Sequence, residues 1–302
     1  MLARLQQATT FGVFGAALAW ALWFADRLLV AGIGALLIAF GYAIFLAVEF
    51  VLLARINRTD PAPRASAAQL VRAWIGEVLT TPRIFYWRQP FRSRVERDWL
   101  PADARRRGVV LVHGFVCNRG LWNPWMRRLR ARGVPYAAVD LEPVFGSIDE
   151  YVPAIDDAVR RVRLATGRTP LVVAHSMGGL AVRAWQADRG SAVHHLISIG
   201  TPHRGTWLAR CAASTNARQM RQDSAWLQAL GRREAERAAR DPTRWTCFYS
   251  HCDNIVFPAS NATLPGADNR HVAGSAHMHL AFVPEVFDEV LRRLDEPATA
   301  AG

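Results

Sequence analysis

Two long apolar stretches form the first part of the chain. No charged residue occurs over residues 5–25 or 28–48, and only two polar residues separate these stretches. Each stretch has 21 residues, and a helix of that length is about 31 Å long, enough to cross the hydrocarbon core of a bilayer. Glycines that allow close helix packing occur in both, and tryptophans lie near the polar tip. The pattern predicts a transmembrane helical hairpin within residues 1–55, with helices at about 5–25 and 28–54.

The charges that flank this hairpin indicate its orientation. Arg4 precedes it, and Arg55, Arg58 and Arg64 follow it. Because the cytoplasmic flanks of membrane helices carry the excess of basic residues, we expect both ends of the hairpin and the following domain on the cytoplasmic side. Two alternatives remain open: a cleaved signal peptide followed by a second apolar segment, and a single span with the opposite orientation.

A connecting region follows over residues 56–105. Residues 57–64 contain two prolines and several charges and have the composition of a linker. Residues 67–79 carry apolar side chains at helical spacing, which predicts an amphipathic helix. This helix lies either on the membrane surface or on the domain that follows. Its apolar side chains are Leu70, Val71, Trp74, Ile75 and Leu79.

Apolar runs alternate with helix-compatible segments over residues 106–296. Short connections join them, which is typical of a mostly parallel, doubly wound α/β sheet with helices on both faces. A helix-prone, arginine-rich insertion at about 207–239 forms either a cap over the site or surface helices. Residues 297–302 are predicted to be a disordered tail. The predicted strands lie within 108–115, 135–140, 171–173, 196–200, 245–250 and 271–273.

The third of these strands runs directly into the segment Ala-His-Ser-Met-Gly-Gly at residues 174–179. A serine between small residues, with a strand before it and a helix after it, is typical of a nucleophile elbow. The small residues allow the strand and the helix to pack closely at the turn. Ser176 is therefore the predicted nucleophile, and the backbone N–H of Met177 is a predicted oxyanion donor.

Partners for this serine occur later in the chain, each just after a predicted strand. Asp253 is placed to orient an imidazole, and His277 is the predicted general base, with His279 as the alternative. The backbone N–H of Phe115, after the first strand of the sheet, is the second predicted oxyanion donor. The order serine, acid, histidine is that of the α/β-hydrolases.

Composition narrows the possible partners. The net charge is +12 and all 37 basic residues are arginine, so the chain suits an anionic surface such as a membrane. No nucleic-acid-binding motif occurs, so nucleic acid is not a predicted partner. The four cysteines lack the spacing of a metal site or of a disulfide framework, and no metal site is predicted.

Taken together, these motifs resemble the bacterial lipase and esterase branch of the α/β-hydrolases, near the triacylglycerol lipases and the inositol-deacylase-like hydrolases. The resemblance extends from about residue 107 to residue 294. It implies the α/β-hydrolase fold and hydrolysis of carboxylic esters without a cofactor. The chain departs from the family pattern at Ala174, where glycine is more common, and in its apolar N-terminal region. The matching segments are 111–115, 174–179, 200–206, 253–256 and 274–277.

These observations predict a membrane-anchored serine ester hydrolase that forms an acyl-enzyme on Ser176. An anchor beside the bilayer favours a lipid-like ester, and the bacterial resemblance places the anchor in the inner membrane. Two alternatives remain: an acyltransferase that uses the same triad, and a non-catalytic membrane scaffold or transport-associated protein with this fold. The oligomeric state is not predicted.

Overall fold

The computed structural model describes residues 1–190, 192–236 and 241–296, and the predicted tail at 297–302 lies outside these ranges. Six strands form one sheet in the order β2-β1-β3-β4-β5-β6, and all neighbouring strands are parallel. The strands are β1 (Val109–Val112), β2 (Tyr136–Ala138), β3 (Leu171–His175), β4 (His195–Ile199), β5 (Trp245–Tyr249) and β6 (Asp268–His271). The predicted parallel α/β sheet is confirmed.

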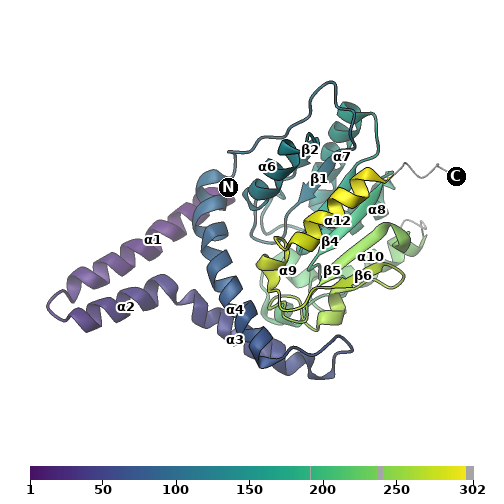
Figure 1. Cartoon of the computed structure of the whole chain (residues 1–302). Coiled ribbons are helices and arrows are strands. Elements are labelled where there is room, and N and C mark those ends of the chain that lie inside the picture. Colours follow the sequence, from purple (N-terminus) through teal and green to yellow (C-terminus); the bar gives the residue numbers. More distant parts are fainter. Residues whose placement is uncertain (191, 237–240, 297–302) are drawn as a thin grey trace.

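Alternate residues of the strands supply two cores, one on each face of the sheet. In β1, Val110 and Val112 join one core, whereas Val109 and Leu111 join the other. This follows from the period of two along a strand. The first core contains α7 (Val152–Thr166) and α8 (Met177–Arg189), and the second contains α6 (Asn123–Ala131) and α12 (Pro284–Asp295). Figure 1 shows α12 lying across one face of the sheet.

The strand order determines where a ligand can bind. From β1 the chain moves to one edge strand, β2, and then returns to β3 on the other side of β1. In such sheets the crevice for a ligand lies at the carboxyl ends of the strands where the winding reverses, which here is between β1 and β3. The loops that follow these two strands contain Phe115 and Ser176.

The described part of the insertion after β4 is mostly helical and lies beside the sheet. It comprises the short 3₁₀ turn η5 (Trp207–Cys211), α9 (Thr215–Gln219) and α10 (Ala225–Glu236). Leu230 of α10 is buried in the core that contains α8. The sequence left open whether the insertion forms a cap over the site or surface helices, and the described residues are surface helices. Residues 237–239 of the predicted insertion lie outside the described ranges.

The N-terminal helices have two different environments. Figure 1 shows α1 (Leu2–Trp23) and α2 (Leu28–Phe40) as an antiparallel hairpin that projects away from the sheet domain. By contrast, α3 (Tyr42–Ile56) packs on the domain, where Phe50 and Leu53 join a third core with Phe257. We expected one helix over about 28–54; the structure has two, with a 55° bend between them.

Gly41 explains the position of this break. A Cβ atom at residue 41 would lie 2.6 Å from the carbonyl oxygen of Leu37, so the local backbone requires glycine. Among the described residues no single helix is long and apolar enough to cross a membrane, although α2 and α3 together meet that test as a bent pair. The predicted transmembrane hairpin is therefore not shown by the fold.

The amphipathic helix α4 (Ala67–Pro82) begins with a capping box formed by Ser66 and Gln69. Its side chains at Leu70, Ala73 and Trp74 pack with α3 and the sheet domain. The chain continues through the π-helical turn η2 (Arg83–Arg88) and α5 (Gln89–Arg92) to the first strand. Of the five apolar side chains predicted for this helix, Leu70 and Trp74 therefore pack on the domain, whereas Val71, Ile75 and Leu79 are exposed. The shorter elements are η1 (Asn57–Thr59), η3 (Arg119–Trp122), η4 (Ile148–Tyr151), η6 (Pro242–Arg244), η7 (Ala259–Ala262) and α11 (His277–Leu280).

Candidate active site

Ser176 lies on a strained turn between β3 and α8. Its backbone angles are φ 57° and ψ −131°, a combination that side-chain-bearing residues rarely adopt. The turn is held by close packing: a Cβ atom at Gly178 would lie 2.4 Å from the carbonyl oxygen of His113. The local sequence thus produces the elbow because small residues allow the helix to start directly against the loop after β1.

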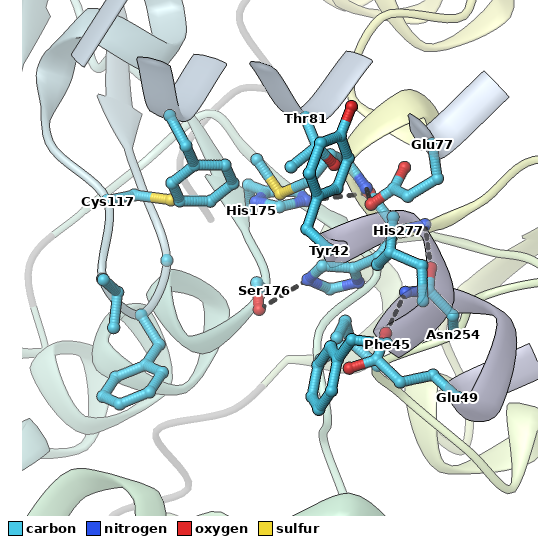
Figure 2. A pocket seen from close by; sticks show the side chains of 17 residues that line it. Tyr42, Phe45, Glu49, Glu77, Thr81, Cys117, His175, Ser176, Asn254 and His277 are labelled. Carbon is cyan, nitrogen blue, oxygen red and sulfur yellow. Dashed lines mark hydrogen bonds between the residues drawn. The ribbon is translucent and has the colours of Figure 1, made fainter. Parts of the chain in front are cut away.

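The three residues predicted as a triad meet at this turn, although they come from distant parts of the chain. The Nε2 atom of His277 lies 2.9 Å from the Oγ of Ser176. The Nδ1 atom of His277 lies 2.9 Å from each carboxylate oxygen of Asp253. All three side chains are buried. Figure 2 shows the serine and the histidine facing each other across the site.

The loop after β5 fixes the Asp253 carboxylate. Its Oδ1 atom accepts hydrogen bonds from the backbone N–H groups of Ile255 and Val256, at 2.9 and 2.8 Å. Since both Asp253 oxygens are acceptors, the Nδ1 of His277 carries the proton that it donates to them. The Nε2 atom is then free to accept the proton of Ser176, which is the requirement for a general base.

Electrostatics around His277 favour its protonated form. Burial lowers the pKa of His277, but the Asp253 carboxylate and its hydrogen bond raise it, and the more distant charges of Glu77 and Glu49 raise it further. The net direction is upwards. An imidazolium formed during proton transfer would therefore be stabilised at this position.

Three further histidines near the site are structural. His175 packs against the ring of His277, with 4.7 Å between the ring centroids, and burial holds its pKa well below the usual value. His113 accepts a hydrogen bond from the backbone N–H of Leu141, so it braces the loop after β1. His203 is hydrogen-bonded to Ser198, 2.9 Å away. These contacts indicate that His113 and His203 hold loops in place.

The two predicted oxyanion donors flank the nucleophile. Met177 follows Ser176 at the start of α8, and Phe115 follows Gly114, where an added Cβ would lie 2.7 Å from the Cβ of Ser176. Within the described part of the chain, neither backbone N–H donates to another protein group. Val116, next in the loop, has a φ of 52°, which is rare for a β-branched residue and indicates backbone strain beside the site.

An apolar cavity of about 320 Å³ opens on Ser176. The loop after β1 lines it through Phe115. Side chains from N-terminal helices, such as Tyr42 and Phe45, line much of the rest (Figure 2). None of the described residues of the insertion, 207–236, lines this cavity. The cover that one of the two alternatives placed there is supplied instead by α3, α4 and η2, whose lining residues are Tyr42, Phe45, Leu46, Glu49, Glu77, Thr81 and Phe85.

His279, the alternative base, lies elsewhere. It lines a second cavity, of about 440 Å³, together with residues of α4 and α6. Its ring approaches Gly76, where an added Cβ would lie 3.4 Å from the Nδ1 atom. The geometry therefore favours His277 over His279 as the partner of Ser176.

Sequence reasoning missed the residues that N-terminal helices bring to the site. Glu49 accepts a 2.6 Å hydrogen bond from Asn254, and Glu77 accepts hydrogen bonds from the backbone that follows His277. The sequence contained a signal for both residues. Glu49 is the only acidic residue within 27–59, and Glu77 is the only one within 61–95. The described residues contain no group of three or more His, Cys, Asp or Glu side chains arranged to hold a metal ion.

Comparisons with known proteins agree with this architecture. The sequence model of the alpha/beta hydrolase family matches residues 109–297. The mature lipase BlEst2 of Bacillus licheniformis has a similar structure, with a TM-score of 0.53 and 18% identity, over 63% of this chain and 94% of that one. Aspergillus fumigatus lipase B gives a TM-score of 0.56 and 18% identity, over 66% of this chain and 55% of that one. A comparison with curated proteins found no match.

Proposed function

Because the chain belongs to the alpha/beta hydrolase family, we propose that it is a serine hydrolase of carboxylic esters. The observation that carries this proposal is the continuous contact from Ser176 through His277 to Asp253, with 2.9 Å at each step. The similar structures are lipases, but at 18% identity they support the fold alone.

In the proposed mechanism His277 removes the proton of Ser176 while the serine oxygen attacks the ester carbonyl carbon. The backbone N–H groups of Met177 and Phe115 stabilise the oxyanion of the tetrahedral intermediate. The imidazolium of His277, oriented by Asp253, then gives its proton to the leaving alcohol, and an acyl-enzyme remains. Water attacks this ester by the same route in reverse and releases the acid.

The apolar cavity beside Ser176 supports the proposal that the enzyme recognises an apolar acyl group of its substrate. Its volume lies at the lower end of the range of about 300–1,000 Å³ for ligand pockets. Apolar side chains such as Phe45, Leu46 and Phe85 line it beside Ser176. We propose a lipid-like ester as the substrate class.

We further propose that the α1–α2 hairpin inserts into a bilayer and anchors the enzyme. Trp23 and Leu28, near the tip, are 82% and 81% exposed, and apolar side chains along both helices are exposed as well. Because a large exposed apolar surface is unfavourable in water, this projecting hairpin supports the proposal of insertion into a membrane. The flanking arginines support a cytoplasmic location of the sheet domain, at a bacterial inner membrane.

Reaction with a fluorophosphonate probe tests the proposed chemistry. Full-length wild-type protein and the Ser176→Ala variant are compared for labelling and for hydrolysis of p-nitrophenyl esters of increasing chain length. We expect labelling and hydrolysis only when Ser176 is present, with the highest kcat/KM for acyl chains that fill the cavity. An unlabelled wild-type protein would refute the proposal, and formation of a transesterified product on addition of an alcohol would identify an acyltransferase instead.

Flotation with lipid vesicles tests the anchor. Wild-type protein should float with the vesicles, and a variant with Leu22→Arg and Leu28→Arg near the tip should float less. Protease digestion of the sheet domain in sealed spheroplasts would contradict the cytoplasmic location.

A further inference from the structure

Three consecutive backbone N–H groups at the start of α11 are held by side chains. The N–H of His277 donates to Oδ1 of Asn254, at 3.2 Å. The N–H groups of Met278 and His279 donate to the two carboxylate oxygens of Glu77, at 3.0 and 3.2 Å. Asn254 is in turn held by Glu49 through its amide nitrogen, at 2.6 Å. The backbone position of the predicted base thus depends on two carboxylates.

Both carboxylates come from N-terminal helices rather than from the sheet domain. Glu49 belongs to α3 and Glu77 to α4, and Glu77 lies 201 positions before its partner Met278. Their side chains are almost completely covered, with exposures of 4% for Glu49 and 2% for Glu77. The helices that cover the cavity therefore also contact the start of α11, where His277 lies.

The absence of an arginine partner sets these two carboxylates apart. Two other buried glutamates of the described chain have such partners: Glu234 pairs with Arg183, and Glu289 pairs with three arginines. Within the described residues, neither Glu49 nor Glu77 forms a salt bridge, although the chain contains 37 arginines. A buried carboxylate without a cation is costly, so these positions are better explained by an interaction with the site than by stability.

The charges that surround Glu77 connect it to the base. Burial raises the pKa of Glu77 to about 7, while the hydrogen bonds from Met278 and His279 and the charge of His277 act in the opposite direction. The carboxylates that face it are Asp253 and Glu49, and the titratable cation that faces it is His277. In return, the Glu77 charge raises the pKa of His277. An ionised Glu77 therefore stabilises the imidazolium that forms during proton transfer.

We propose that Glu77, assisted by Glu49 through Asn254, is a positioning residue that holds His277 in register with Ser176. The N-terminal helices are then part of the catalytic unit and not only an anchor. This inference rests on the proposed function, because it assigns a role to residues that act through the predicted base.

Substitution of Glu77 by glutamine tests the inference in the full-length enzyme. Glutamine keeps one acceptor oxygen, but its amide group opposes the second backbone N–H, and the charge is lost. We expect kcat to fall about 10- to 100-fold, as for other misplaced catalytic groups, with little change in KM. The acid limb of kcat/KM should move to lower pH, because the Glu77 charge that is present above about pH 7 raises the pKa of His277 and is lost in this variant. Glu77→Asp, which keeps the charge, should restore the position of this limb.

Glu289→Gln is the matched control, since it removes a buried carboxylate from α12, away from the site. It should leave the pH of the acid limb unchanged, and unfolding temperatures of all variants show which are folded. The inference is wrong if the folded E77Q variant keeps the wild-type kcat and the wild-type pH of the acid limb. It is also wrong if the kcat of E77Q falls only as far as that of E289Q and Glu77→Asp does not restore the acid limb. In both cases the proposed function stands. If the wild-type enzyme neither reacts with a fluorophosphonate nor hydrolyses esters, both fail.

Discussion

Replacement of Asp253 by asparagine isolates the role of the acid with little change in shape. The Oδ1 atom of Asp253 accepts hydrogen bonds from Ile255 and Val256 and is also 2.9 Å from Nδ1 of His277, whereas Oδ2 contacts His277 alone among the described residues. An asparagine at this position keeps its oxygen toward the two backbone N–H groups, since an amide nitrogen there would oppose two donors. Its NH₂ group then replaces Oδ2 and faces the Nδ1 atom of His277.

This exchange favours the wrong tautomer of His277. A donor facing Nδ1 makes that atom the acceptor, so Nε2 carries the hydrogen and no longer accepts the proton of Ser176. The negative charge that raises the pKa of His277 is lost as well. In other triads this change lowers kcat by about 10⁴, which corresponds to about 5.4 kcal/mol of transition-state stabilisation. We expect a loss of about 10³- to 10⁴-fold here.

The assay compares kcat for a p-nitrophenyl ester and the rate of fluorophosphonate labelling in wild type and Asp253→Asn, with Ser176→Ala as the inactive reference. The unfolding temperature of Asp253→Asn should stay close to that of the wild type, because its backbone hydrogen bonds are retained. A folded variant with kcat within tenfold of the wild type would show that Asp253 does not orient the base.

The remaining predictions concern pH, stability and the covering helices. Wild-type kcat/KM should decrease as the pH falls through the pKa of His277, with a midpoint above the usual 6.5, because the base must be neutral and its pKa is raised; a midpoint below 6.5 would contradict this. Burial raises the pKa of Glu289, but hydrogen bonds from Arg292 and Arg293 and the charge of Arg270 lower it to about 2. Since its folded-state pKa is depressed, the stability lost in Glu289→Gln should be complete above about pH 4.5 and should shrink as the pH falls toward 2, as measured by unfolding temperature. Phe45→Trp should narrow the cavity and lower kcat/KM for long acyl chains more than for acetate esters; an equal effect on both would argue against an acyl site there.

Local sequence was sufficient to predict the sheet and the elbow. Continuous apolar runs with short connections are typical of the buried strands of a parallel sheet, and five of the six predicted strands overlap their observed counterparts over most of their length. The sixth was expected at 271–273 but lies at Asp268–His271. This strand is at the edge of the sheet, is polar and is incompletely buried, so it carries no hydrophobic signal.

The choice between the two candidate bases required three dimensions. His277 and His279 are two residues apart in α11, and side chains at that spacing point to different sides of a helix. Nothing in the sequence states which side faces Ser176. That depends on how the loop before α11 is held, and it is held partly by Glu77, a residue from another region of the chain.

The prediction of one helix over about 28–54 was wrong for the same reason, because contacts between distant segments decide which side chains are buried. Hydropathy adds up apolar side chains without distinguishing those that face lipid from those that face protein, so 28–54 was predicted as one membrane helix. In the structure Phe50 and Leu53 face the sheet domain, and Glu49 would have no polar partner in a bilayer but has Asn254 here. A lone carboxylate in an otherwise apolar helix was therefore the sequence signal that this segment turns toward a polar site. It follows that the hairpin and the cover of the active site are continuous through the bend at Gly41.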